Sequence, residues 1–146
     1  MTNPFLAAML EHGLLSYEAA QILACAAALR ACAVTGVTDP RVHAAIDAAE
    51  RYAIGRASRA ELETATSGVC EAIEAQRDAA IRQTEMDTDE WRRCDAQWYA
   101  TRAAYYATSD TAKAVQAALA AARRAHGADW RAELEAQVAD IVEVMP

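Results

Sequence analysis

The stretch AAERYAIGRASRAELETA, which runs from Ala48 to Ala65, predicts that one helix ends and the next begins within a few residues. Gly55 can take the left-handed conformation that commonly follows the last residue of a helix, because glycine has no Cβ. Ser58 and Glu61 form an S-x-x-E capping box, in which each side chain accepts a hydrogen bond from the other residue's backbone N–H. This stretch therefore predicts two helices joined by a short turn.

Similar caps and helix-ending glycines divide the rest of the chain into helical segments. The expected segments run from Pro4 to Gly13, Tyr17 to Val34, Pro40 to Ile54, Ser58 to about Thr84, Asp87 to about Ala107, Ser109 or Asp110 to Gly127, and Asp129 onward. No stretch alternates apolar and polar residues over enough positions to indicate a strand. We therefore predict an all-α fold, a single compact bundle of six or seven helices, with residues 1–146 in one helical domain.

The composition predicts a thin core, because alanine dominates it and phenylalanine occurs once. Small side chains let helix axes approach toward the close end of the usual packing range, about 8 Å. The second segment is nearly apolar through its middle, so we expect it to be the buried central helix. Its apolar residues at helical spacing are Ile22, Leu23, Ala26, Leu29 and Ala33.

The charge and the N-terminal sequence limit the classes of partner. A net charge of −7 and a pI near 4.9 argue against general nucleic-acid binding and favour a protein partner with a basic surface. The chain begins with neither a basic region nor a long apolar stretch, so we expect no signal peptide and no membrane association. The four cysteines contain no C-x-x-C pair, which predicts reduced, buried thiols and a cytoplasmic protein.

An aromatic stripe marks the fifth segment. Trp91, Trp98 and Tyr105 are spaced by sevens, and Arg102 follows Trp98 by one helical turn, which predicts a cation–π contact. Such a stripe is typical of the core ridge of a bundle. Tryptophan, tyrosine and arginine are also the residues that dominate binding interfaces, so both interpretations stay open.

The two pairs of aromatic residues in this segment point in different directions. Tyr99 and Tyr106 lie about 100° around the helix from Trp98 and Tyr105, so both pairs cannot face a thin core. We expect Trp98 and Tyr105 to be buried, and Tyr99 and Tyr106 to be partly exposed with Arg102 at the edge. The predicted binding residues are Tyr99, Arg102, Tyr106 and Trp98.

Metal and catalytic sites find little support in the sequence. His43, Asp47 and Glu50 share one face of the third segment, but a metal site in a bundle draws ligands from several helices, and no second ligand pair occurs. The chain has no phosphate-binding glycine loop, G-x-S-x-G elbow or H-E-x-x-H pair. We therefore predict no metal site, no catalytic residues, no cofactor and no enzymatic activity.

Two groups of carboxylates can form negative helix faces that mimic phosphate and occupy a basic groove of another protein. The groups are Glu61, Glu63, Glu71, Glu74 and Asp78 in the fourth segment, and Glu133, Glu135, Asp140 and Glu143 in the last. Solvated helix faces of the same composition are common, which is the alternative interpretation.

Two stretches carry a resemblance to a known family. They are DPRVHAAIDAAERYAIGRASRAELETA from Asp39 to Ala65 and WRAELEAQVADIVEVM from Trp130 to Met145. Together with the alanine-rich middle, the chain resembles the alanine-rich, all-helical immunity proteins of bacterial polymorphic toxin systems and related helical bacteriophage proteins. The resemblance implies a helical fold and a role in conflict between bacteria, toxins or phages, and it supplies no catalytic residues.

These observations lead to three hypotheses about function. The first is a non-enzymatic protein that binds and inhibits another protein, as an immunity factor or a phage-encoded inhibitor of host defence. The second is a small-ligand or nucleotide-binding sponge with the four predicted binding residues around a pocket. The third is a metal-dependent hydrolase built on the His43 cluster. The sequence leaves the oligomeric state open.

Overall fold

Helices make up nearly all of the chain that the structure describes. The structure is a computed structural model, and it describes residues 8, 11–13, 15–81, 89–126 and 131–144. Among these residues no strand occurs, so the all-α prediction is confirmed. The helices are α2 (Tyr17–Thr35), α3 (Pro40–Ala53), α4 (Arg59–Ile81), α5 (Asp89–Ala107), α6 (Thr111–His126) and α7 (Arg131–Val144).

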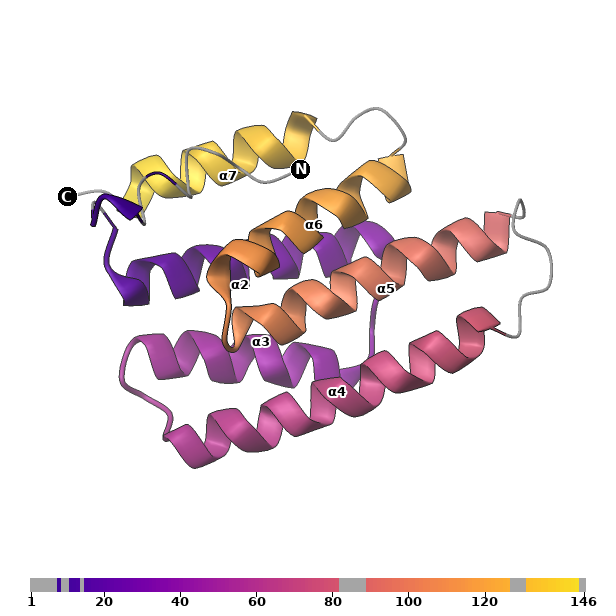
Figure 1. The fold of residues 1–146 in the computed structure, drawn as a ribbon, viewed down its shortest axis with the longest axis horizontal. Helices are drawn as coiled ribbons and strands as arrows, with labels where there is room; N and C mark the ends of the chain where they lie inside the picture. Colours follow the sequence, from indigo (N-terminus) through magenta and orange to yellow (C-terminus); the bar gives the residue numbers. More distant parts are fainter. Residues whose placement is uncertain (1–7, 9–10, 14, 82–88, 127–130, 145–146) are drawn as a thin grey trace.

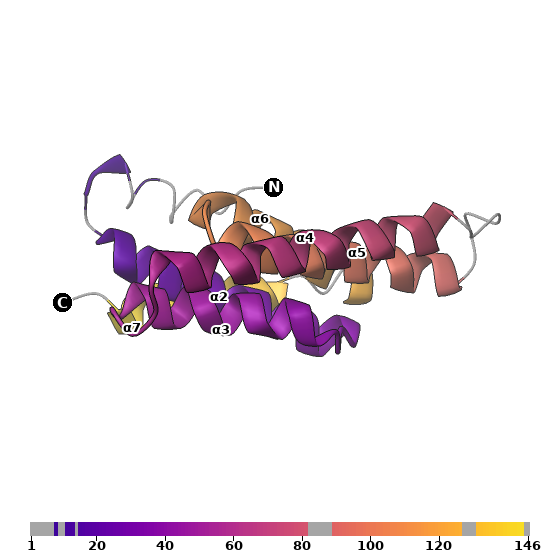
Figure 2. The ribbon, with the colours of Figure 1, turned by 90° about the horizontal axis from the view of Figure 1, so that it is seen from below.

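The helices lie in two layers (Figure 1, Figure 2). One layer contains α4, α5 and α6 side by side, and the other contains α3, α2 and α7. α2 is the middle helix of its layer and packs against both α5 and α6 across the bundle. The predicted bundle is therefore confirmed. α5 and α6 pack extensively against each other and lie side by side on one outer face.

The turn between α3 and α4 has the predicted form. Gly55 adopts a left-handed φ of 75°, directly after the end of α3. The Ser58 hydroxyl accepts a hydrogen bond from the Glu61 N–H at 3.1 Å, and the Glu61 carboxylate accepts one from the Ser58 N–H at 2.6 Å. That backbone hydrogen bond holds the pKa of Glu61 below its usual value. Local chemistry alone therefore fixes this boundary.

The other caps follow the sequence where the structure describes them. The side chains of Ser16, Asp39 and Asp110 accept backbone hydrogen bonds at the starts of α2, α3 and α6. Gly36 ends α2 with a φ of 76°. Most of the predicted first helix, Asp87 of the predicted fifth-helix cap and the predicted cap at residue 129 lie outside the described residues.

Alanine forms most of the core. The main cluster of buried side chains contains 23 residues, of which 16 are alanine. Five alanines of α5 are buried, and four of them belong to this cluster, together with buried alanines of α2 and α6. With so little side-chain volume between them, these helices approach closely, as the composition predicts.

The buried face of α2 differs from the predicted one. Leu23 is buried, but Leu29 is 50% exposed, Ala33 is exposed, and Ile22 and Ala26 are half-buried. The prediction for Leu29 and Ala33 is therefore wrong. The reason is steric, because the alanine face of α2 can approach α5 and α6 more closely than a face of larger side chains can. Among the described helices, α2 alone is long and apolar enough to cross a membrane, and buried core helices can have the same length and composition.

The cysteines are free thiols of two kinds. Cys25 and Cys32 are buried in the main core cluster, whereas Cys70 and Cys94 are half-buried. Burial raises the pKa of both core thiols from 9.0 to about 12, and the charge of Glu50 contributes to the rise at Cys25. The prediction of buried thiols is thus confirmed for two of the four.

Ala104→Leu should destabilise the fold by about 3 kcal/mol, because Ala104 is fully buried and the close helix packing leaves no room for three more carbon atoms. Urea unfolding followed by circular dichroism measures the loss. Ala112→Leu adds the same atoms at an exposed position of α6 and should change stability little. Equal effects of the two substitutions would contradict the close packing.

The two core thiols should make stability fall as the pH rises above 9. In the folded protein they keep their protons until about pH 12, whereas in the unfolded chain they lose them near pH 9.0. Deprotonation therefore favours unfolding, by up to about 1.4 kcal/mol per pH unit for each thiol. Urea unfolding across pH 7 to 11 should show a shallower decline for the Cys25→Ala/Cys32→Ala variant, and parallel declines would contradict the assignment.

Candidate functional site

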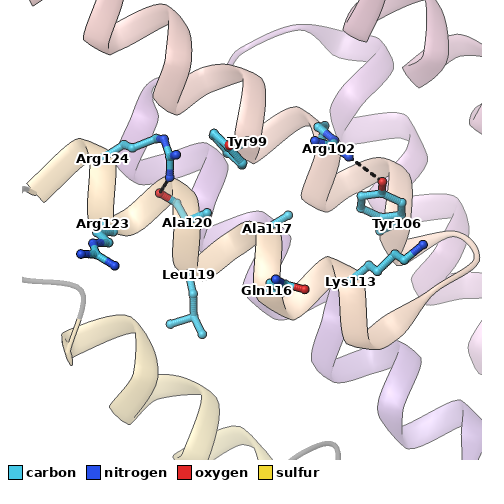
Figure 3. Close-up of a pocket in the computed structure, with 10 residues that line it drawn as sticks. All are labelled: Tyr99, Arg102, Tyr106, Lys113, Gln116, Ala117, Leu119, Ala120, Arg123 and Arg124. Carbon is cyan, nitrogen blue, oxygen red and sulfur yellow. Dashed lines mark hydrogen bonds between the residues drawn. The ribbon is translucent and has the colours of Figure 1, made fainter. Parts of the chain in front are cut away.

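The described residues form a groove between α5 and α6, called here the α5–α6 groove (Figure 3). It has a volume of about 560 Å³ and is open to solvent. Its lining consists of Tyr99, Arg102 and Tyr106 of α5, and Lys113, Gln116, Ala117, Leu119, Ala120, Arg123 and Arg124 of α6. The structure therefore brings three of the four predicted binding residues into one groove.

The α5 wall is a ladder of stacked side chains. Trp98, Arg102 and Tyr106 follow one another at intervals of four residues. The Arg102 guanidinium lies 4.5 Å from the centre of the Trp98 ring, so the predicted cation–π contact is confirmed. The same guanidinium lies 5.4 Å from the centre of the Tyr106 ring and donates a hydrogen bond to its hydroxyl at 2.7 Å. Trp98 lies outside the groove lining and restricts the position of Arg102.

The α6 wall supplies further cations. The Arg124 guanidinium lies 3.8 Å from the centre of the Tyr99 ring, and its Nε donates a hydrogen bond to the Asp95 carboxylate at 2.6 Å. The Lys113 ammonium lies 5.6 Å from the centre of the Tyr106 ring. Each tyrosine of the groove therefore contacts a cation from the neighbouring helix.

The sequence reasoning missed this wall, although the sequence contains a signal for it. Lys113, Gln116, Ala120 and Arg124 recur at steps of three and four, which places them on one face of α6. α6 is also the one described helix without aspartate or glutamate. Such a basic face in a chain of net charge −7 could have been found before the structure.

The groove is positive, in contrast to the chain as a whole. Among the described residues that line it, none carries a carboxylate. Arg124 is paired with Asp95, and Lys113 lies 3.8 Å from a carboxylate oxygen of Asp110. Within the described part of the chain, neither Arg102 nor Arg123 has a carboxylate partner. The arrangement can therefore accept an anionic group at these two guanidinium groups.

All four of the large aromatic residues around Arg102 are half-buried. The partial exposure predicted for Tyr99 and Tyr106 is confirmed, whereas the burial predicted for Trp98 and Tyr105 is wrong. Helices that approach on alanine leave no space for large rings between them, so the rings lie at the rim of the core. Three of them, Tyr99, Tyr105 and Tyr106, pack against the main core cluster. Tyr99 and Tyr106 therefore contribute to the packing of the bundle as well as to the groove.

The residues of the hypothetical metal site, His43, Asp47 and Glu50, do not share a common partner. His43 Nε2 lies 3.0 Å from the Val37 carbonyl oxygen, and the Asp47 carboxylate accepts a hydrogen bond from Arg51 at 2.8 Å. Among the residues that the structure describes, no group of three or more potential ligands is close enough to hold a metal ion. His43, Asp47 and Glu50 thus share a helix without converging on one point.

The acidic group of α7 is partly structural. Arg30 of α2 donates two hydrogen bonds to the Glu133 carboxylate, at 3.0 and 3.1 Å, and one to Asp140 at 2.7 Å. Glu133 is buried and also accepts a hydrogen bond from Gln137 at 2.9 Å. The forked guanidinium therefore ties α7 to α2, a long-range contact that helical spacing could not predict.

Three of the five carboxylates in the acidic group of α4 make contacts at the protein surface. Glu61 belongs to the capping box, Glu63 pairs with Arg59, and a Glu71 oxygen lies 3.9 Å from a nitrogen of Arg41. These side chains are exposed, so each pair contributes little to stability. The proposal that this face mimics phosphate stays a prediction.

Arg30→Met should destabilise the protein by about 3 kcal/mol, because it leaves the buried Glu133 carboxylate beside Asp140 without a cation. Hydrogen exchange should show the largest loss of protection in α7. Adding Glu133→Gln to Arg30→Met should recover part of the loss by removing one of the two carboxylates. Unchanged exchange in α7 would contradict the role of this ion pair.

Comparison with known proteins identifies no relative of this chain. No family model, no curated protein and no solved structure matches it. The resemblance to immunity proteins therefore stays a prediction, and the chemistry of the α5–α6 groove is the ground on which a function can be proposed.

Proposed function

We propose that this chain is a non-catalytic binding protein that blocks another protein through the α5–α6 groove. The observation that carries the proposal is the set of tyrosine and cationic side chains from two helices, stacked on one another in a solvent-open groove. The few residues that dominate the binding energy of protein interfaces are enriched in tryptophan, tyrosine and arginine. In the setting that the resemblance implies, the blocked protein is a toxin or a component of host defence.

The stacked arrangement supports tight binding because it is formed before a partner arrives. Long side chains such as arginine lose about 0.5–1.5 kcal/mol of conformational entropy each when an interface immobilises them. Arg102 is already held by Trp98 and Tyr106, and Arg124 by Tyr99 and Asp95. Much of this entropic cost therefore arises on folding, and less of it opposes binding.

The charge of the groove favours an acidic group on the partner. The described residues that line it include four cationic side chains and no acidic one. The net charge of −7 led to the prediction of a partner with a basic surface. That prediction still applies to the acidic surface outside the groove. A partner that presents an acidic group beside basic regions would satisfy both parts of the molecule.

A small anionic ligand is the second candidate, and the size of the groove favours it. A volume of about 560 Å³ lies within the range typical of small-molecule sites, about 300–1,000 Å³. The two candidates differ in what they require outside the groove. A protein partner buries a wider surface, on the order of 800 Å² on each side.

Lys113→Glu combined with Arg123→Glu should abolish capture of the partner from cells that carry the gene. Both side chains are exposed, so reversing their charges should leave the fold intact while repelling an acidic group. Quantitative mass spectrometry of affinity-purified complexes compares the variant with the unmodified protein. The captured protein's own activity, measured with and without this chain, then tests inhibition.

Arg56→Glu combined with Arg77→Glu is the matched control, because both residues are exposed and lie outside the groove lining. It changes the net charge by the same amount. Loss of one captured protein with the groove variant alone would support the proposal. Identical sets of captured proteins for both variants and the unmodified chain would refute it.

A further inference from the structure

We propose that the α5–α6 groove binds an acidic peptide segment, whose carboxylates pair with the cations at the two ends of the groove. This inference rests on the proposed function, since it names the part of the partner that the groove contacts. Three observations carry it: the spacing of the cations, the carboxylates that already pair with two of them, and the occupied surfaces of the tyrosine rings.

The cations are spread along the groove rather than gathered at one point. Lys113 and Arg124 stand near its two ends, with Arg102 on the opposite wall near Lys113 (Figure 3). At 1.5 Å per residue, Lys113 and Arg124 are about 16 Å apart along the axis of α6. An extended peptide covers that length with about five residues, at 3.3 Å each. A single phosphate or carboxylate group is too short to pair with both ends.

The groove already pairs with carboxylates of its own chain. Asp95 accepts a hydrogen bond from Arg124 at 2.6 Å at one end, and a carboxylate oxygen of Asp110 lies 3.8 Å from the Lys113 ammonium at the other. In both pairs the cation also contacts a tyrosine ring. Each pair is therefore an internal example of a carboxylate bound by a ring-stacked cation, and each aspartate competes with an acidic ligand for that cation.

The tyrosine rings argue against a nucleotide as the ligand. A base would need an open ring surface on which to stack. Tyr99 contacts Arg124 and the Trp98 ring, with the two ring centres 5.1 Å apart, and it packs against the core. Tyr106 contacts Arg102, Lys113 and the Tyr105 ring and also packs against the core.

Between the cations, the groove offers a group suited to a peptide backbone. Gln116 is exposed in the lining, where its amide can both donate and accept hydrogen bonds. The two alanines of the lining leave room for a chain to pass close to α6. A peptide with carboxylates at the ends of the groove and its main chain in the middle would thus contact the end cations, Gln116 and the alanines.

Fluorescence anisotropy with a labelled oligoglutamate peptide tests the inference, with oligoglutamine as the neutral control. Oligoglutamate should bind and oligoglutamine should not. Arg102→Gln combined with Arg124→Gln should weaken binding roughly tenfold or more, since each loses a charge-assisted contact. Arg56→Gln combined with Arg77→Gln removes the same charge outside the groove and should leave the affinity nearly unchanged. Circular dichroism checks that each variant is folded.

Asp95→Asn provides a test in the opposite direction. It keeps the shape of the side chain but removes the internal competitor of Arg124, so oligoglutamate should bind severalfold more tightly. Asp110→Asn should act similarly at Lys113, and asparagine still caps α6. A merely structural role for these aspartates would leave the affinity unchanged or lower it.

Three results would overturn the inference: no binding of oligoglutamate, equal weakening by the groove variant and its control, or stronger competition by ATP than by the unlabelled peptide. If oligoglutamate fails while the Lys113→Glu/Arg123→Glu variant still loses its partner protein, the proposed function stands and the acidic segment is wrong. If both experiments fail, the groove is not the binding site.

Discussion

The constraint on which the rest of this structure depends is the small volume of alanine. A helix pair that meets on alanine has no void to fill, so its axes settle close together and its stability comes from many weak contacts at short range. α2 and α5, the middle helices of the two layers, meet in this way. A leucine or an aromatic side chain has no space at the centre of this contact and has to lie at its rim. The positions of Leu29 on α2 and of the tyrosines on α5 both follow from this limit.

The same limit places the aromatic side chains of the proposed binding site at the surface. In a bundle with a leucine core, aromatic residues at the spacing of Trp98 and Tyr105 would fill the interior. Here both stand beside the helix contact, where Trp98, like Tyr99 and Tyr106, presents its ring to a cationic side chain. The groove thus combines a rigid backbone platform with side chains that hold one another in place.

Local sequence signals were sufficient to predict the helices and several of their ends. They did not predict how the helices contact one another. The capping box at Ser58 and Glu61 and the left-handed Gly55 depend on neighbouring residues alone, so they could be predicted. The buried face of α2 could not be predicted in the same way. This helix is apolar on nearly all sides, so its sequence does not indicate which side faces the core. The Arg30 contact with Glu133 joins positions 103 residues apart, which spacing within one helix cannot indicate.

For the groove, the sequence indicated one wall and missed the other. Tyr99, Arg102 and Tyr106 are conspicuous because aromatic residues are rare in this chain. Lys113 and Arg124 are conspicuous only once α6 is known to lie along α5. The pairing of α5 with α6 is a tertiary fact, and the positive charge of the groove follows from that pairing.

The opposition between a positive groove and a negative molecule has a consequence for how a partner approaches. At distances beyond the Debye length, about 10 Å at 0.1 M salt, only weak repulsion reaches an acidic partner from a chain of net charge −7. Closer in, an approach over α6 meets attraction, and approaches over the other helices meet their carboxylates. For the partner proposed above, association would then depend on orientation: encounters over the wrong face would be repelled before contact, so the uneven charge would contribute selectivity at the cost of speed.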